Sequence, residues 1–219
     1  MSAENGAIPA ATVVLGREGT DGLEVLMLRR NSKLAFGGMW VFPGGRVDDA
    51  DRTPGDDELS WARTAAVREA AEETGLAVVP DSLVAFSKWV PPPIAPKRFA
   101  TWFFLAPAPP GHVVVDMGEI HEHLWAHPSE VLARRDAGAV ELAPPTWVTL
   151  HWLSGFESVA SAQASVIEPA VFATRVGRGE SPRVVMWAGD AGYETGDVDA
   201  AGPRHRLVMH ERWEYLRST

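Results

Sequence analysis

The sequence predicts one mixed α/β domain with a C-terminal extension, on the strength of three observations. Apolar runs rich in Val, Leu and Phe alternate with Gly- and Asp-rich turns, as β-strands do. A long helical pattern over residues 58–74 lies among them and ends at Gly75. The 219 residues show no internal repeat, low-complexity tract or domain linker. We therefore expect a single domain over residues 1–219, with a core at about 10–156 and an extension at about 157–219.

The individual elements follow from local patterns. Two strands joined by a turn are expected at residues 11–16 and 23–30, then a loop, a brief strand and a tight turn over 37–45. An exposed acidic loop over 46–58 should precede the long helix. Further strands are expected at 83–90, 98–108, 112–117, within 118–127, at 183–189 and at 205–216. Helices are expected at 128–138, begun by a proline, and at 144–156, with Leu150, Trp152 and Leu153 facing inward.

Composition excludes several classes of function. The net charge is −9 and no long run of Lys and Arg occurs, so we expect no nucleic-acid partner. The chain has no cysteine, which excludes disulfides, thiolate metal sites and a cysteine nucleophile. Any metal must then bind oxygen or imidazole ligands. No apolar run approaches the ~20 residues of a membrane helix, and the first residues lack a secretory signal, so we expect a cytoplasmic protein.

The sequence REAAEETGL, residues 68–76, concentrates acidic groups on the long helix. Glu72 and Glu73 follow Glu69 by three and four residues, so the three side chains fall within an arc of about 100°. Carboxylates this close repel one another unless a cation or protons neutralise them. Mg²⁺ or Mn²⁺, which prefer oxygen ligands, would relieve the repulsion, and Arg68 would offset part of it.

A solvated helix face with an ordinary ion pair would produce the same acidic pattern. The upstream Pro-Gly-Gly, residues 43–45, changes the balance, because its glycines can bring backbone groups close to a packed helix. Together, the glycine turn and the acidic helix favour a metal site.

The combined pattern resembles the Nudix box, in which a glycine and a later glutamate precede Arg-Glu-apolar-x-Glu-Glu-x-Gly-apolar. Residues 68–76 match the second half at every fixed position, and Gly45 matches the opening glycine. The resemblance implies a Nudix fold, with a mixed β-sheet sandwiched between helices (α/β/α). It also implies Mg²⁺ or Mn²⁺ as cofactor and hydrolysis of a diphosphate. Glu69, Glu72, Glu73 and the Gly45 carbonyl would be the metal ligands.

The first half of the box departs from the family pattern. Asp51 stands where a glutamate is expected, and 22 residues separate Gly45 from Arg68, nine more than in the family. Either Asp51 or Glu58, near the helix start, could replace the missing glutamate.

Further site residues are implied by the same resemblance. Glu69, Glu72 and Arg68 would be catalytic, with Arg68 bracing the cluster. Family members recruit another glutamate from a distant loop, for which Glu122 is our candidate and Glu119 the alternative. The residues themselves, rather than the resemblance, suggest Arg98, Phe99, Trp40 and Arg29 as substrate-binding candidates, with an ordinary core or solvated position as the alternative for each.

Segments around the box are similar to Nudix motif 19-type acyl-coenzyme A diphosphatases. They are LRRNSKLAFGGMWVFPGG, WVPPPIAPKRFATWFF and LAPPTWVTLHWL. The similarity implies a small-molecule diphosphate substrate, coenzyme A or acyl-coenzyme A. ADP-ribose, NADH or a nucleoside triphosphate are alternative substrates, and a ligand sensor without catalysis is an alternative function. The extension after Phe156 could form a homodimer or roof the pocket.

Overall fold

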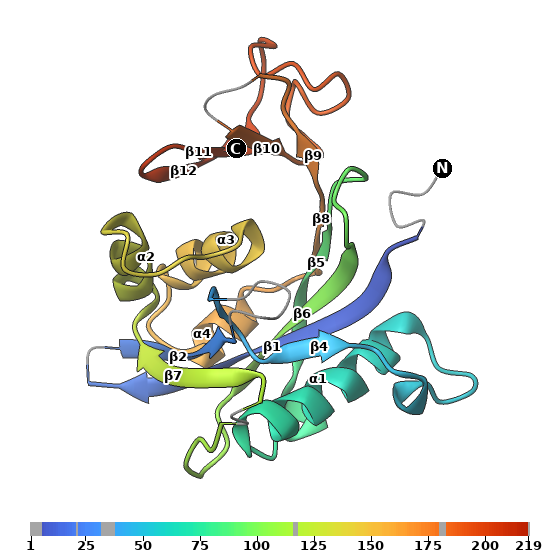
Figure 1. Ribbon diagram of the computed structural model, residues 1–219, viewed down its shortest axis with the longest axis vertical. Coiled ribbons are helices and arrows are strands. Elements are labelled where there is room, and N and C mark those ends of the chain that lie inside the picture. The colour runs from blue at the N-terminus through green and yellow to red at the C-terminus, as the bar shows by residue number, and fades with distance from the viewer. Residues whose placement is uncertain (1–5, 21, 32–37, 116–117, 180–182, 219) are drawn as a thin grey trace.

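The computed structural model describes residues 6–20, 22–31, 38–115, 118–179 and 183–218. Eight strands form a mixed sheet in the order β3-β2-β1-β6-β5-β8, with β4 added beside β1 and β7 beside β2 (Figure 1). The β1–β6 and β5–β8 pairs are parallel and the others are antiparallel. The strands are β1 (Ile8–Gly19), β2 (Gly22–Arg30), β3 (Trp40–Val41), β4 (Gly44–Arg46), β5 (Val84–Val90), β6 (Phe99–Pro107), β7 (Ile120–Ala126) and β8 (Ala170–Ala173).

Helix α1 (Glu58–Thr74) covers one face of this sheet (Figure 1). Alternate residues of the central strands point toward it, as the two-residue period of a strand requires. Val13 and Leu15 of β1 and Phe104 of β6 pack there against the small side chains Ala62 and Ala66. Small residues let the helix approach the sheet closely, which places its acidic residues near strand backbone.

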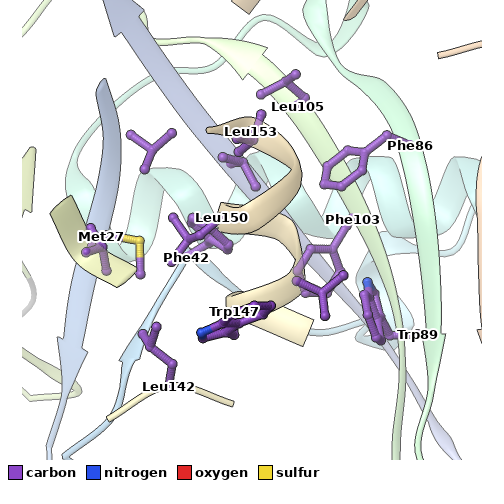
Figure 2. Close-up of a cluster of buried hydrophobic side chains, with 14 of the residues drawn as sticks. Met27, Phe42, Phe86, Trp89, Phe103, Leu105, Leu142, Trp147, Leu150 and Leu153 are labelled. Carbon is purple, nitrogen blue, oxygen red and sulfur yellow. The ribbon is translucent and has the colours of Figure 1, made fainter. Parts of the chain in front are cut away.

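The other face of the sheet is covered by helices α2 (Pro128–Asp136), α3 (Pro144–Leu153) and α4 (Val159–Ala164). Figure 2 shows Leu150 and Leu153 of α3 near Phe42, in the β3–β4 connection, and Phe103 of β6. Leu150 and Leu153 are fully buried, as expected, whereas Trp152 is only partly buried and stacks on Phe86. The two helical layers around a mixed sheet confirm the predicted α/β/α architecture.

A second, four-stranded antiparallel sheet follows near the C-terminus, in the order β12-β11-β10-β9. Its strands are β9 (Arg175–Val176), β10 (Arg183–Met186), β11 (His205–Met209) and β12 (Trp213–Arg217). Aromatic contacts join this sheet to the preceding part of the chain. Trp187 lies edge-on to Trp89 of β5, and the ring centroids of Trp213 and Trp147 of α3 are 6.1 Å apart. The extension also contributes α4 and β8, so it packs against the sheet that carries α1.

Two predicted strands are corrected. Residues 205–216 form a hairpin, β11 and β12, rather than one strand. His112–Val115, the described part of the strand expected at 112–117, has no strand structure. Val113 and Val115 pack instead on the core beneath α1, and the Val114 N–H donates to the Thr74 carbonyl. Their apolar character reflects this packing and not strand pairing.

The loop expected over residues 46–58 is mostly exposed, but Arg46 ends β4 and Val47 is buried. In addition, Asp49–Asp51 form a short 3₁₀ helix in which Asp51 is buried. Among the described residues, no helix is both long and apolar enough to cross a membrane.

Candidate active site

Both ends of α1 are fixed by local chemistry. The Asp57 carboxylate accepts a 2.9 Å hydrogen bond from the Ser60 N–H, so it caps the first turn. Gly75 takes the left-handed conformation, with φ of 70°, and its N–H bonds to the Ala71 carbonyl. The helix therefore begins and ends where the sequence predicts. Its last two turns carry Glu69, Glu72 and Glu73.

The glycine turn lies directly against this part of the helix. The Gly44 N–H donates a 2.9 Å hydrogen bond to Glu73 Oε2, and both groups are buried. A Cβ atom on Gly45 would collide with the Glu69 carboxylate. Gly44 also has φ of 156°, and a Cβ there would collide with the β1 backbone at Ala11. Gly44 is thus required by the close approach of the β1 backbone, whereas a side chain at Gly45 would force the Glu69 carboxylate to move.

Arg68 connects the acidic residues to one another. Its Nη1 donates to Glu69 Oε1 and to Glu72 Oε2, each at 2.9 Å. On the other edge of the guanidinium, Nε and Nη2 donate to the two oxygens of Asp51 at 3.0 and 2.8 Å. Nη2 also donates to the Arg46 carbonyl at 3.0 Å. Arg68 therefore braces Glu69 and Glu72, as the sequence predicts.

The electrostatics of the cluster disfavour bare carboxylates. Glu73 is 4% exposed, and burial raises its pKa to about 7 despite the Gly44 hydrogen bond and the nearby charge of Arg30. Burial also raises the pKa of Glu69, against the opposing effect of Arg68, and the charges of Glu72 and Glu119 add to the rise. Such a site gains from an added cation.

The structure distinguishes the two glutamates considered for the distant segment. Glu119 receives a 2.8 Å hydrogen bond from Arg30 Nη2, and its charge raises the pKa of both Glu69 and Glu73. Glu122 lies opposite Arg29 in the β2–β7 ladder, with 3.4 Å between Arg29 Nη1 and Glu122 Oε2. Glu119, rather than Glu122, thus lies within electrostatic reach of the cluster.

The expected substrate-binding residues lie in different places. Trp40 is 6% exposed and packs in the core between the sheet and α3, which argues against stacking on a ligand. Arg98 is partly buried and donates to the Pro91 carbonyl, while the adjacent Phe99 ring lies under Lys97. Arg29 is half exposed at the end of β2. Sequence pattern alone does not separate a core tryptophan from a ligand-stacking one.

The choice between Asp51 and Glu58 is decided by their contacts. Asp51 is 3% exposed and binds Arg68, and although burial raises its pKa, the hydrogen bonds from Arg68 and Asp48 lower it overall. Glu58 instead pairs with Lys88 at 3.0 Å and accepts from Trp102 Nε1 at 3.1 Å, in the first turn of α1. Asp51 is therefore the acidic residue joined to the cluster.

The donor set suits a hard divalent cation, because it consists of carboxylates beside backbone that approaches them closely. Two features favour such an ion: the Gly45 backbone lies directly against the Glu69 carboxylate, and the carboxylate of Glu73 is buried. Among the described residues, no three acidic or histidine side chains lie close enough together, in their present orientations, to coordinate a metal ion. Glu69 and Glu72 are turned to Arg68, and Glu73 to Gly44.

A cavity of about 260 Å³ lies elsewhere, between the β5–β6 connection and the β9 region. It is lined by Pro92, Pro93, Ile94, Arg175, Val176, Arg178, Glu194, Thr195 and Gly196. No residue of the acidic cluster contributes to it, so the candidate site rests on the cluster and not on this cavity.

Comparison with known proteins finds a family match. Residues 7–153 match the model of the NUDIX domain. A Caenorhabditis elegans protein that carries the name nudix hydrolase 7 is 28% identical over 183 residues, covering 66% of this chain. The chain spans 60% of the length of that relative.

Solved structures show the same fold. A NUDIX hydrolase from Alicyclobacillus acidocaldarius superimposes with a TM-score of 0.64 at 25% identity, covering 74% of this chain and 98% of its own. The NUDIX domain of Shewanella oneidensis NrtR, solved with ADP ribose, gives a TM-score of 0.51 at 18% identity, covering 67% of this chain and 85% of its own.

Proposed function

Since this chain belongs to the Nudix family, we propose that it is a metal-dependent hydrolase that cleaves a diphosphate linkage in a nucleotide-like small molecule. The observation that best supports this proposal is the arrangement of the acidic side chains of α1. Glu69 lies against the Gly45 backbone, Glu73 accepts from Gly44, and Arg68 joins Glu69 to Glu72. A helix whose acidic groups were merely solvated would not bury Glu73 or bring the Glu69 carboxylate against the Gly45 backbone.

In this proposal, Glu69, Glu72, Glu73 and the Gly45 carbonyl hold Mg²⁺ or Mn²⁺. Bound metal would screen the diphosphate oxygens and lower the pKa of a bound water. The protein residues orient the carboxylates: Arg68 fixes Glu69 and Glu72, and the Gly44 N–H fixes Glu73. Phosphoryl transfer depends mainly on such positioning and charge stabilisation.

The reaction adds one water across the diphosphate. The water oxygen forms a bond to one phosphorus, the bridging P–O bond breaks, and two phosphate monoesters leave. The proton released by the water passes to a carboxylate. Glu119 is the better placed of the two distant glutamates to accept it, because its charge reaches Glu69 and Glu73. Glu122 is retained as the alternative.

Coenzyme A or acyl-coenzyme A is the substrate we propose to test first, on the similarity of the segments flanking the box. Ala100 stands where that group of proteins has an aspartate in an Arg-Phe-Asp-Thr run. ADP-ribose is the main rival, because the NrtR domain of the same fold was solved with it. NADH and nucleoside triphosphates complete the set of alternatives.

The experiment is hydrolysis of each compound with Mg²⁺ or Mn²⁺, followed by chromatography of the products. Two products that result from cleavage of the diphosphate linkage of one compound would support the proposal, and no turnover of coenzyme A would remove the first substrate choice. Glu69→Gln serves as the inactive control. Tight binding of a compound without turnover would instead favour the ligand-sensor alternative.

A further inference from the structure

The cavity beside β9 lies where the C-terminal extension meets the mixed sheet. One wall comes from the β5–β6 connection, and the other comes from β9 and the β10–β11 connection. Figure 1 shows β9 continuing from β8 at the sheet edge, beside the β5–β6 connection. The volume of the cavity is about 260 Å³. Ligand pockets often occur at seams of this kind, and the chemistry of the two walls determines which ligand can bind.

The wall from the β5–β6 connection is apolar and stiff. Pro92, Pro93 and Ile94 line it, and Val176 of β9 adds a further apolar side chain. Ile94 is 78% exposed although its side chain is large and apolar. The proline rings fix their own φ angles, so little backbone freedom remains to be lost when a ligand binds. This wall therefore offers a preformed surface on which a flat ring can pack.

The opposite wall is cationic. Arg175 and Arg178 face only one acidic lining residue, Glu194, so the lining is positive although the whole chain carries a net charge of −9. The Arg178 side chain lies along the backbone of Gly196, where a Cβ atom would come within 3.2 Å of Arg178 Cγ. Within the described part of the chain, Arg178 forms no ion pair. Its guanidinium group is thus available for an anionic ligand.

Arg175 is oriented by an aromatic ring. Its guanidinium group lies over Tyr193, 5.1 Å from the ring centroid. Arg175 Nη2 is also 3.5 Å from Glu194 Oε2, but these two side chains are 49% and 79% exposed. An exposed ion pair of this kind contributes little free energy, so an anion with better geometry can replace Glu194.

We propose that this cavity is a binding site for a nucleoside monophosphate. The phosphate group accepts hydrogen bonds from Arg175 and Arg178, because the forked donors of guanidinium groups match phosphate oxygens. The base packs on the apolar wall at residues 92–94. Inorganic phosphate would use only the cationic wall and a nucleoside only the apolar one. The site shares no residue with the acidic cluster on α1, so the proposal does not depend on the hydrolysis proposed above.

Calorimetric titration of the full chain with AMP, GMP, CMP and UMP in metal-free buffer tests the proposal. Without metal, the carboxylates of the acidic cluster repel phosphate and do not compete for it. At least one nucleotide should bind and raise the melting temperature, because it binds the folded state. Inorganic phosphate and the matching nucleoside should each bind at least about 10-fold more weakly, since each contacts one wall. Binding by none of the four nucleotides, or equal affinity for inorganic phosphate, overturns the proposal.

Arg178→Ala should weaken nucleotide binding by about 10-fold or more, because hydrogen bonds to a charged group are lost. Arg134→Ala is the matched control. Arg134 is 45% exposed and pairs with Glu130 in α2, so its replacement makes the same change in net charge at another surface. The control should bind the nucleotide as wild type does. Equal losses in the two variants would reflect net charge alone and overturn the proposal.

Two further variants test the two walls separately. Glu194→Gln should tighten nucleotide binding by about twofold to fivefold, because it removes the carboxylate that competes for Arg175. Ile94→Ala should weaken nucleotide binding by about threefold or more and leave the affinity for inorganic phosphate unchanged. Both side chains are exposed, so both variants should fold. Weaker binding in Glu194→Gln or unchanged binding in Ile94→Ala overturns the proposal.

Glu69→Gln locates the bound nucleotide. In metal-free buffer this variant should bind the nucleotide with wild-type affinity, because Glu69 does not line the cavity. A changed affinity would place the nucleotide at the acidic cluster and overturn the proposal.

Discussion

The backbone of Gly45 lies so close to the Glu69 carboxylate that a Cβ atom on Gly45 would overlap the carboxylate where it stands. Gly45 pairs with Ala11 in the β4–β1 ladder, so the strand cannot retreat without breaking sheet hydrogen bonds. Glu69 is held from the other side by Arg68. The carboxylate is thus confined between strand backbone and guanidinium, and a methyl group must displace it.

Gly45→Ala should therefore reduce activity by about 10²-fold, because a displacement of about 1 Å at a reacting centre can cost that much. Steady-state kinetics and Mn²⁺ titration measure the effect. Gly155→Ala is the control, because its Cβ would meet only the Trp152 carbonyl at an ordinary 3.5 Å. Unchanged kinetics in Gly45→Ala would show that the close approach has no part in function.

Glu73→Gln should stabilise the metal-free protein while it removes activity. Burial raises the pKa of Glu73 to about 7, so the ionised side chain is disfavoured in the folded state. Glutamine has the same shape and still accepts the Gly44 hydrogen bond without carrying charge. The free energy of unfolding at pH 8 in EDTA should rise by about 1–3 kcal/mol. Denaturant titration measures it, and lower stability in Glu73→Gln would contradict the buried charge.

The long helix and its acidic cluster could be predicted because each depends on local signals. The helix is bounded by a capping aspartate and a glycine, and the spacing of Glu69, Glu72 and Glu73 alone places them on one face. The turn at Pro43–Gly45 is likewise a local feature. What these elements contact could not be read from the pattern.

Long-range packing explains the errors. Asp51 stands in a polar loop, and its burial depends on an arginine 17 residues away. Trp40 lies in the core, but the sequence pattern around a core tryptophan is the same as that around one that stacks on a ligand. The β11–β12 hairpin turns at residues 210–212, which contain no Gly, Pro, Asn or Asp to indicate a turn. Each case was decided by tertiary contacts.

The buried pair Asp190–Arg206 predicts acid sensitivity in the C-terminal sheet. Burial raises the pKa of Asp190, but hydrogen bonds from Arg206, the His205 N–H and the Gly192 N–H outweigh it and bring the value to about 2. Because the folded pKa lies below the ordinary value of 3.8, the pair stabilises the fold above about pH 4. That contribution, about 2 kcal/mol, should be lost as the pH falls from about 4 to 2.

Denaturant titrations between pH 2 and 7 check this expectation. Asp190→Asn should be less stable than wild type at neutral pH, and the difference should shrink toward pH 2. Asp197→Asn is the control, because the Asp197 side chain is exposed and bonds only to the Asp199 N–H among the hydrogen bonds that the structure describes. A stability difference that is constant across this range would show that Asp190 does not titrate with the fold.

Glu119→Gln should reduce kcat far more than Glu122→Gln does. Both glutamates are exposed and each is paired with an arginine, but the charge of Glu119 acts on Glu69 and Glu73, whereas Glu122 faces Arg29 across the ladder. Loss of a positioned proton acceptor costs about 10²-fold to 10⁴-fold, so Glu119→Gln should fall in this range and Glu122→Gln should stay within about threefold of wild type. Both substitutions preserve side-chain shape, so melting temperatures should be similar. The pH profile of kcat distinguishes the roles further, because removing the acceptor should abolish the acidic limb of the profile. Equal kinetics in the two variants would assign the proton acceptor to another residue, and the reverse order would restore Glu122.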